Sequence, residues 1–303
     1  MNEPFDLVSY LEKKLKQNPF DYACFFDEIK NQFDLEKTIF CYEYILKNSN
    51  DTKLINRTIK EINSNKTPNC LGFLIDFILK PSTKSDFLDL KVLAIKTISN
   101  YRDKNALGAL MYCLNDKNSN YKIRLSAIEA LGKIGDKSAF EPLGKIICDD
   151  KEKSAYVKEQ AATALGMLGD NRALDVFSSI MNTKQIFLDK FCYLKERIVE
   201  ALSKFDISKD KKALTILKSS LLDTNPRVRI SAIETLMSSD IEGSYNLIYE
   251  RLKFDDDIEV QKNALIALYN ISDKNILLEV LEGKFNSVLK LYAKEIIDEY
   301  ENE

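Results

Sequence analysis

A period of 34 residues constrains this 303-residue sequence more than any other feature. Residues 123–136 (IRLSAIEALGKIGD) and 157–170 (VKEQAATALGMLGD) align at that offset. The identical positions are Ala127/Ala161, Ala130/Ala164, Leu131/Leu165, Gly132/Gly166, Gly135/Gly169 and Asp136/Asp170. Weaker copies occupy residues 90–103, 194–206, 228–240, 260–273 and 289–300. A period of this length indicates one unit of secondary structure repeated along the chain.

Each copy predicts an amphipathic helix. The apolar positions follow the i, i+4, i+7, i+8, i+11 spacing of one buried stripe, in Ile123, Ala127, Ala130, Leu131 and Ile134. Gly135 and Gly169 directly follow the periodic segments, where helices commonly end in the left-handed conformation. Alanine and glycine on the stripe would let a second helix approach closely.

Another apolar segment precedes each copy, at residues 104–115, 137–149, 171–182, 209–222, 242–253 and 274–283. Upstream, we expect helix pairs at 4–16/20–32, 35–47/51–63 and 69–80/86–101. Asn225 followed by Pro226 predicts an N-cap and a first helical residue. The unit is therefore a helical hairpin, which buries its apolar stripe only against its neighbours. We expect an all-α fold, an α-solenoid (right-handed superhelix) of about nine stacked helical hairpins.

The N-terminal part differs from the rest. Residues 1–85 lack the repeat signature, and residues 1–48 hold ten of the 30 aromatic residues. Because terminal repeats must be atypical, we expect 1–85 to form divergent, aromatic-rich capping hairpins. An alternative is that these aromatic residues form a docking surface for a partner. Residues 86–303 would carry the regular repeats, and both parts would belong to one continuous solenoid.

Composition excludes several kinds of chemistry. The chain has no His and no Trp, and 44 basic residues stand against 47 acidic residues. Without imidazole, neither a Ser–His–Asp arrangement nor a histidine metal site can form. No Cys-x-x-Cys motif occurs, so we expect no metal, no cofactor and reduced thiols, with Cys70 and Cys192 the least clearly buried. We see no secretory signal and no apolar run of 18 residues, so we expect a cytoplasmic protein outside the membrane.

The VRxxAxxALGxxGD pattern of residues 120–182 resembles HEAT repeats, specifically the subtype named for phycobilisome lyases. The resemblance implies the solenoid fold. Proteins with this fold range from scaffolds to a few enzymes. Deoxyhypusine hydroxylases of similar repeat hold two irons with His–Glu pairs, which a chain without His does not provide. HEAT-like DNA glycosylases use Trp and a basic groove, whereas this chain has no Trp and a net charge of -3. Bilin lyase subunits remain an alternative, because their nucleophilic Cys belongs to the client protein.

In such a stack, the second helix of each hairpin lines the concave side. Its outward positions are Lys122, Ser126, Glu129, Lys133, Tyr156, Gln160, Thr163, Met167, Tyr193, Arg197, Glu200 and Lys204. Tyr, Met and Arg are enriched in interface cores, so we predict that these residues bind a protein partner. The alternative is a solvated face with scattered apolar residues.

A second column of positions is basic in six of seven copies: Lys91, Arg124, Lys158, Lys195, Arg229, Gln261 and Lys290. The resemblance implies a structural ladder at this position, in which a basic residue pairs with Asp of the turn between helices. Candidate partners just upstream are Asp116, Asp149 or Asp150, Asp223, and Asp255 to Asp257. The alternative is nucleic-acid binding, although Glu129, Glu200, Glu234 and Glu295 on the outward face would repel phosphate.

We therefore expect a non-catalytic scaffold, adaptor or assembly factor that binds a protein partner on its concave face. The first alternative is a phycobilin lyase-type subunit, which would bind bilin and attach it to or remove it from phycobiliproteins. The second alternative is a nucleic-acid-binding protein. If the chain is an enzyme, the bilin lyase hypothesis is the one that fits.

Overall fold

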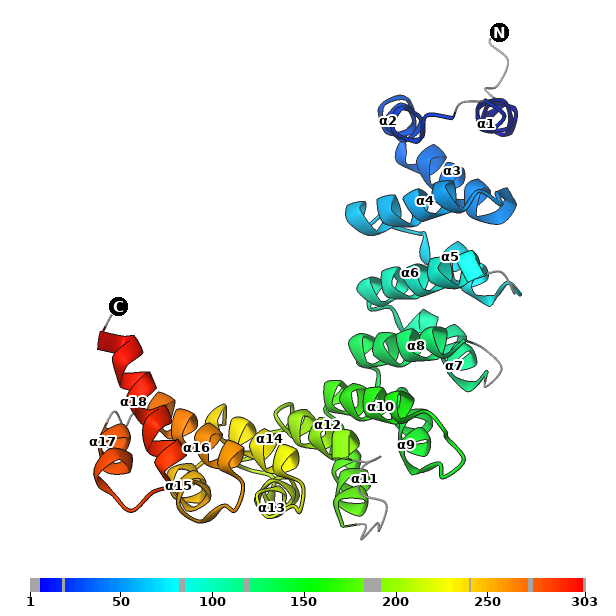
Figure 1. Ribbon diagram of the computed structural model, residues 1–303. Helices are drawn as coiled ribbons and strands as arrows, with labels where there is room; N and C mark the ends of the chain where they lie inside the picture. Colours follow the sequence, from blue (N-terminus) through cyan, green and yellow to red (C-terminus); the bar gives the residue numbers. More distant parts are fainter. Residues whose placement is uncertain are drawn as a thin grey trace. The chain divides into compact units, whose positions relative to one another are not determined.

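The computed structural model describes residues 6–17, 20–81, 85–116, 120–182, 192–239, 241–271 and 275–301. Over these ranges the chain forms α-helices joined by short loops and contains no strand. The 18 α-helices within the described ranges follow one another as nine hairpins, so the expected all-α fold of stacked hairpins is confirmed (Figure 1). The chain divides into two compact units, Met1–Asp136 and Lys137–Glu303. The right-handed sense and the limit of the cap at residue 85 stay predictions.

The first unit holds four hairpins. Their helices are α1 (Leu7–Leu15), α2 (Tyr22–Gln32), α3 (Leu35–Asn48), α4 (Thr52–Asn65), α5 (Leu71–Leu79), α6 (Ser85–Tyr101), α7 (Leu107–Asn115) and α8 (Tyr121–Ile134). A short 3₁₀ turn, Lys104–Ala106, leads into α7. The second helices α4, α6 and α8 pack side by side in one row, and the first helices α3, α5 and α7 form a second row (Figure 1).

The second unit holds five hairpins. Their helices are α9 (Phe140–Cys148), α10 (Ala155–Leu168), α11 (Arg172–Met181), α12 (Cys192–Leu202), α13 (Lys211–Ser220), α14 (Pro226–Met237), α15 (Ser244–Phe254), α16 (Ile258–Ile271), α17 (Asn275–Glu282) and α18 (Ser287–Glu301). The second helices α10, α12, α14, α16 and α18 pack successively against one another (Figure 1). This row carries most of the predicted partner-binding residues.

The helix ends follow the local sequence signals. Gly135 and Gly169 lie in the left-handed region, with φ of 77° and 58°, and end α8 and α10 as predicted. Asn225 accepts a hydrogen bond from the backbone N–H of Arg227, and Pro226 begins α14. In the first two hairpins, α1 to α4, the N-caps are aspartates, at Asp6, Asp21, Asp34 and Asp51.

The small residues of the repeat allow close packing. Ala127 and Ala161 are fully buried, as the stacking hypothesis requires. At Gly166 in α10, an added Cβ would lie 2.7 Å from the Cβ of Ala201 in α12 and 3.1 Å from its Cα. Separations below 3 Å are closer than carbon atoms tolerate, so only glycine permits this approach of the two helices.

The cysteine expectation needs correction. Cys70 is fully buried at the start of α5, whereas Cys24 and Cys148 are exposed. The sequence interpretation missed this because Cys70 directly precedes a helix, so helical periodicity does not assign it a face. Burial raises the pKa of Cys41 and of Cys70 to about 12. The side chain of Cys192 lies outside the described residues.

Candidate partner-binding site

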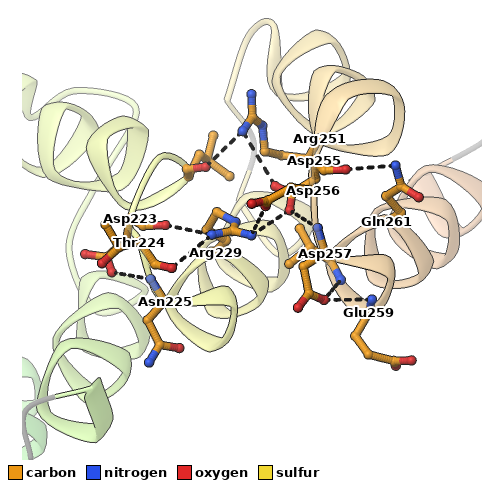
Figure 2. Close-up of polar contacts among 12 residues, drawn as sticks. Asp223, Thr224, Asn225, Arg229, Arg251, Asp255, Asp256, Asp257, Glu259 and Gln261 are labelled. Atoms are coloured by element: carbon orange, nitrogen blue, oxygen red, sulfur yellow. Dashed lines mark hydrogen bonds and ion pairs between the residues drawn. The ribbon is translucent and has the colours of Figure 1, made fainter. Parts of the chain in front are cut away.

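The predicted basic column lies near the N-terminal ends of the second helices, and its members Lys195 and Arg229 contact the next hairpin. Arg229 in α14 donates from Nη2 to Asp255 Oδ1 at 2.7 Å and to Asp256 Oδ1 at 2.8 Å. Its Nη1 donates to the carbonyl oxygens of Asp223, at 2.9 Å, and Thr224, at 3.3 Å (Figure 2). Asp223 and Thr224 belong to the hairpin of Arg229, whereas Asp255 and Asp256 belong to the next. One guanidinium group therefore bridges two hairpins.

Asp255 is the buried acceptor of this contact. Its side chain is 1% exposed, and it also accepts a hydrogen bond from the backbone N–H of Asp257 at 3.1 Å. Arg251 Nη1 lies 3.6 Å from its second oxygen (Figure 2). A carboxylate at this depth is costly unless it is paired. The contacts of Asp255 meet that requirement.

The same arrangement recurs one hairpin earlier. Lys195 Nζ in α12 lies 2.7 Å from Asp223 Oδ2, and both side chains are nearly buried. Asp223 thus presents its carboxylate to the preceding hairpin and its carbonyl oxygen to Arg229 in its own.

Gln261 in α16 occupies the position equivalent to Arg229. Its Nε2 donates to the Asp255 carbonyl oxygen at 3.0 Å. The next loop, residues 283–286, reads Gly-Lys-Phe-Asn and offers no carboxylate. A neutral amide suits this position, because a cation here would lack the acidic partner.

The basic positions of the first unit are also buried. Arg124 Nε donates to the Leu114 carbonyl oxygen at 3.1 Å, and Lys91 Nζ donates to the carbonyl oxygen of Lys80. In the second unit, Lys158 is buried as well. The last carbonyl groups of a helix lack intrahelical partners, so a cation placed beside them satisfies them.

The direction of pairing differs from the expectation. The loop just upstream of each basic residue was expected to supply the carboxylate. In the pairs of Lys195 and Arg229, that carboxylate comes from the following hairpin, while the upstream loop of Arg229 supplies carbonyl oxygens. The reason is that the charged end of a long basic side chain reaches the loop of the next hairpin, while the loop of its own hairpin turns carbonyl oxygens toward Arg229 Nη1.

The outward face of α10 and α12 carries large exposed side chains. Tyr156 is 69% exposed, Tyr193 45% and Met167 40%. The guanidinium carbon of Arg227, in α14, lies 5.3 Å from the centre of the Tyr193 ring. We name the outward positions of α10, α12 and α14 the second-helix face.

The other predicted residues of this face are polar. Gln160 and Thr163 are half-buried, and the Thr163 hydroxyl donates to the carbonyl oxygen of Glu159 at 3.2 Å. Arg197, Glu200 and Lys204 are exposed. Arg197 and Glu200 form an ion pair of 2.5 Å with each other.

In the first unit, three of the four predicted residues reach the surface of α8. Lys122 and Lys133 are exposed, and Glu129 is half-buried and pairs with Lys133 at 2.7 Å. Ser126 is buried, so its predicted outward position is wrong. The equivalent Ser231 shows why: its hydroxyl lies 3.5 Å from the Glu196 carbonyl oxygen of the preceding second helix. A small side chain at this position lies between helices.

Sequence reasoning missed two glutamates on the second-helix face. Glu159 and Glu196 are half-buried at a repeat position that is Leu125 or Ile230 in other copies. Burial raises the pKa of Glu159, although the charge of Arg197 opposes the shift. An acidic residue at a repeat position that is apolar in several other copies was the available signal.

Burial also raises the pKa of Glu196, and the charges of Glu200 and Glu159 add to that shift while Arg227 and Arg197 oppose it. Glu234, on α14, has a pKa raised by partial burial and then by the charge of Glu200. We name Glu159, Glu196 and Glu234 the glutamate row.

The first unit has a hollow along its own second helices. Residues of α2, α4 and α6 line a groove of about 560 Å³. Its walls carry both charges, from Lys53, Arg57 and Lys60 on α4 and from Asp86 and Asp89 on α6. The mixed lining gives this groove no clear preference for one charge.

Comparison with known proteins identifies the repeat. The family described as HEAT repeats matches residues 75–153 and 117–188, so this part of the chain consists of HEAT repeats. No curated protein matches.

Solved structures show similar helical architecture. Human deoxyhypusine hydroxylase in complex with glycerol is 17% identical, over 89% of this chain and 98% of that chain, with a TM-score of 0.39. The complex of CpcE and CpcF of phycocyanin lyase from Nostoc sp. PCC7120 is 23% identical, over 76% of this chain and 87% of that chain, with a TM-score of 0.45. Neither likeness identifies an activity or a ligand for this chain.

Neither a membrane-spanning helix nor a metal-binding cluster occurs among the described residues. No described helix has the length and apolar character needed to cross a membrane. Within the same described ranges, no group of three or more Cys, Asp or Glu side chains is arranged to hold a metal ion.

Proposed function

We propose that this chain is a HEAT-repeat scaffold that binds a protein partner across the second-helix face. The main observation that supports this proposal is the exposure of Tyr156, Met167 and Tyr193 on two adjacent helices of a regular stack. Aromatic and methionine side chains are enriched in the centre of protein interfaces. The polar residues around them would form the rim of the interface.

The ladder behind this face supports the proposal, because it holds the second helices at regular spacing. Lys195 and Arg229 each join their own hairpin to the next one. Because the helices that carry the exposed side chains are already positioned, little conformational entropy is lost on binding. The roles of adaptor, assembly factor and cytoplasmic protein belong to the same proposal.

The test is a quantitative pull-down from the source cells with wild-type protein as bait. In the variant Tyr156→Ala/Tyr193→Ala, we expect the specifically enriched partner to fall at least tenfold. The matched control is Tyr112→Ala/Tyr121→Ala, which removes two exposed tyrosines of the first unit. If the face variant retains its partners as well as the control does, the proposed face is wrong.

The ladder bears on the nucleic-acid alternative. Arg124 and Arg229 are nearly buried and hydrogen-bonded, so they do not form a basic surface for phosphate groups. Binding that strengthens steeply as salt is lowered would favour that alternative.

The bilin lyase alternative rests on the repeat signature and stays a prediction. Co-expression with a phycobiliprotein and bilin should then give a tetrapyrrole absorbance on the client protein.

A further inference from the structure

The centre of the second-helix face holds one carboxylate oxygen that has no hydrogen-bond donor among the described residues. Glu196 lies on α12, between α10 and α14, and its Oε1 atom is buried with no hydrogen bond from the described part of the chain. A buried polar atom without a partner is rare in folded proteins, and a donor that reached it would remove an unfavourable desolvation.

Two acidic and two basic groups act on Glu196, so its own carboxylate is the excess charge of this group. The ionisable groups whose charges act on it are Glu159 on α10, Arg197 and Glu200 on α12, and Arg227 on α14. Glu234 on α14 lies within the influence of the same Glu200.

The two arginines are already engaged. Arg197 pairs with Glu200, and Arg227 lies over the ring of Tyr193. Within the described residues, no carboxylate of the glutamate row has a basic group within ion-pair distance. Among the described residues, the row therefore holds three carboxylates without an ion-pair partner.

The surroundings of the row fit a particular kind of cation. Tyr156, Met167 and Tyr193 are exposed on the same two helices that carry Glu159 and Glu196. Aromatic rings bind ammonium and guanidinium groups on their faces and pack against aliphatic chains. Lysine and arginine side chains combine a charged head with an aliphatic stem. A bare metal ion would leave the aromatic surface unused.

We propose that the second-helix face binds a lysine- or arginine-rich segment of a partner protein, with a basic side chain hydrogen-bonded to Glu196. The neighbouring carboxylates of the row accept further basic side chains, and the tyrosines pack against their stems. This inference rests on the proposed function and names the partner's chemistry. An acidic segment or a nucleic acid is repelled by the same row.

The test uses four fluorescein-labelled 12-residue peptides that share every apolar and aromatic position. Their four variable positions are all Lys, all Arg, all Gln or all Glu, and binding to the full chain is measured by fluorescence anisotropy. We expect the Lys and Arg peptides to bind at least tenfold more tightly than the Gln peptide, and the Glu peptide not to bind. The preference should weaken as salt is raised.

The variant Glu159→Gln/Glu196→Gln/Glu234→Gln keeps side-chain shape and removes the charge. We expect it to weaken binding of the basic peptides at least tenfold, with circular dichroism unchanged. The control variant Glu141→Gln/Glu242→Gln/Glu250→Gln changes net charge equally at exposed glutamates elsewhere in the second unit, and should retain binding.

The outcomes separate this inference from the proposed function. Equal binding of the Gln and Lys peptides, no binding of the basic peptides, or equal loss in both glutamine variants would overturn the basic-segment proposal. Loss of the cellular partner in the tyrosine variant would still support the face itself. If the tyrosine variant keeps that partner, the face is wrong whatever the peptides do.

Discussion

Replacement of Arg229 by methionine removes one member of a buried ion pair and leaves the other. The Arg229 side chain is 8% exposed, and that of Asp255 is 1% exposed. Removing one partner of a buried pair costs about 3–5 kcal/mol, because the remaining charge is left uncompensated. Asp255 keeps the backbone N–H of Asp257 and the more distant Arg251. We therefore expect a loss near the lower limit, about 3 kcal/mol, since methionine fills much of the volume.

The assay is urea unfolding followed by circular dichroism. The control is Lys212→Met, which breaks a pair of similar length between neighbouring first helices, Lys212 Nζ to Asp175 Oδ1 at 2.6 Å. Those side chains are 62% and 68% exposed, so we expect a much smaller loss than for Arg229→Met. Because repeat proteins are stabilised by nearest-neighbour interfaces, Arg229→Met should also broaden or split the transition.

A double-mutant cycle with Asp255→Asn isolates the pair. The double variant should lose less than the sum of the single variants, by about 1–3 kcal/mol, because the amide no longer leaves a charge buried. If Arg229→Met costs no more than Lys212→Met, or the two substitutions are additive, the ladder does not stabilise the stack as argued.

In thermal melts, Gly166→Ala should destabilise the protein by about 1–3 kcal/mol, because the new methyl group would lie 2.7 Å from the Cβ of Ala201. The control Gly144→Ala, whose methyl group would have no neighbour closer than 3.8 Å, should be neutral or stabilising in the same assay. With a disulfide reagent at pH 8, peptide mapping should show Cys148 modified in the folded protein and Cys70 only after unfolding, since burial raises the Cys70 pKa to about 12; rapid reaction of Cys70 would contradict its burial. Burial raises the pKa values of the glutamate row above those of the unfolded chain, so their contribution to stability is present below about pH 4 and is lost as pH rises through the raised values. The melting temperature of wild type relative to the triple glutamine variant should therefore fall as pH rises from about 4 to 7, and a constant difference would refute the shifts.

Local signals in the chain predicted the hairpins well. The stripe through Ala127 and Ala161 indicated which positions are buried, and Gly135 and Gly169 marked the helix ends. Asn225 predicted the start of α14. These features depend on residues within one or two turns of each other, so periodicity and capping preferences suffice to find them.

Contacts between hairpins were beyond such signals. The partner of Arg229 is 26 residues away, and the choice between an upstream and a downstream aspartate depends on how the hairpins pack. The burial of Ser126 and the orphaned oxygen of Glu196 have the same origin. Whether a side chain between two rows of helices meets water, backbone or another charge depends on the offset between neighbouring helices. That offset is set by packing across the interface and is absent from any single repeat.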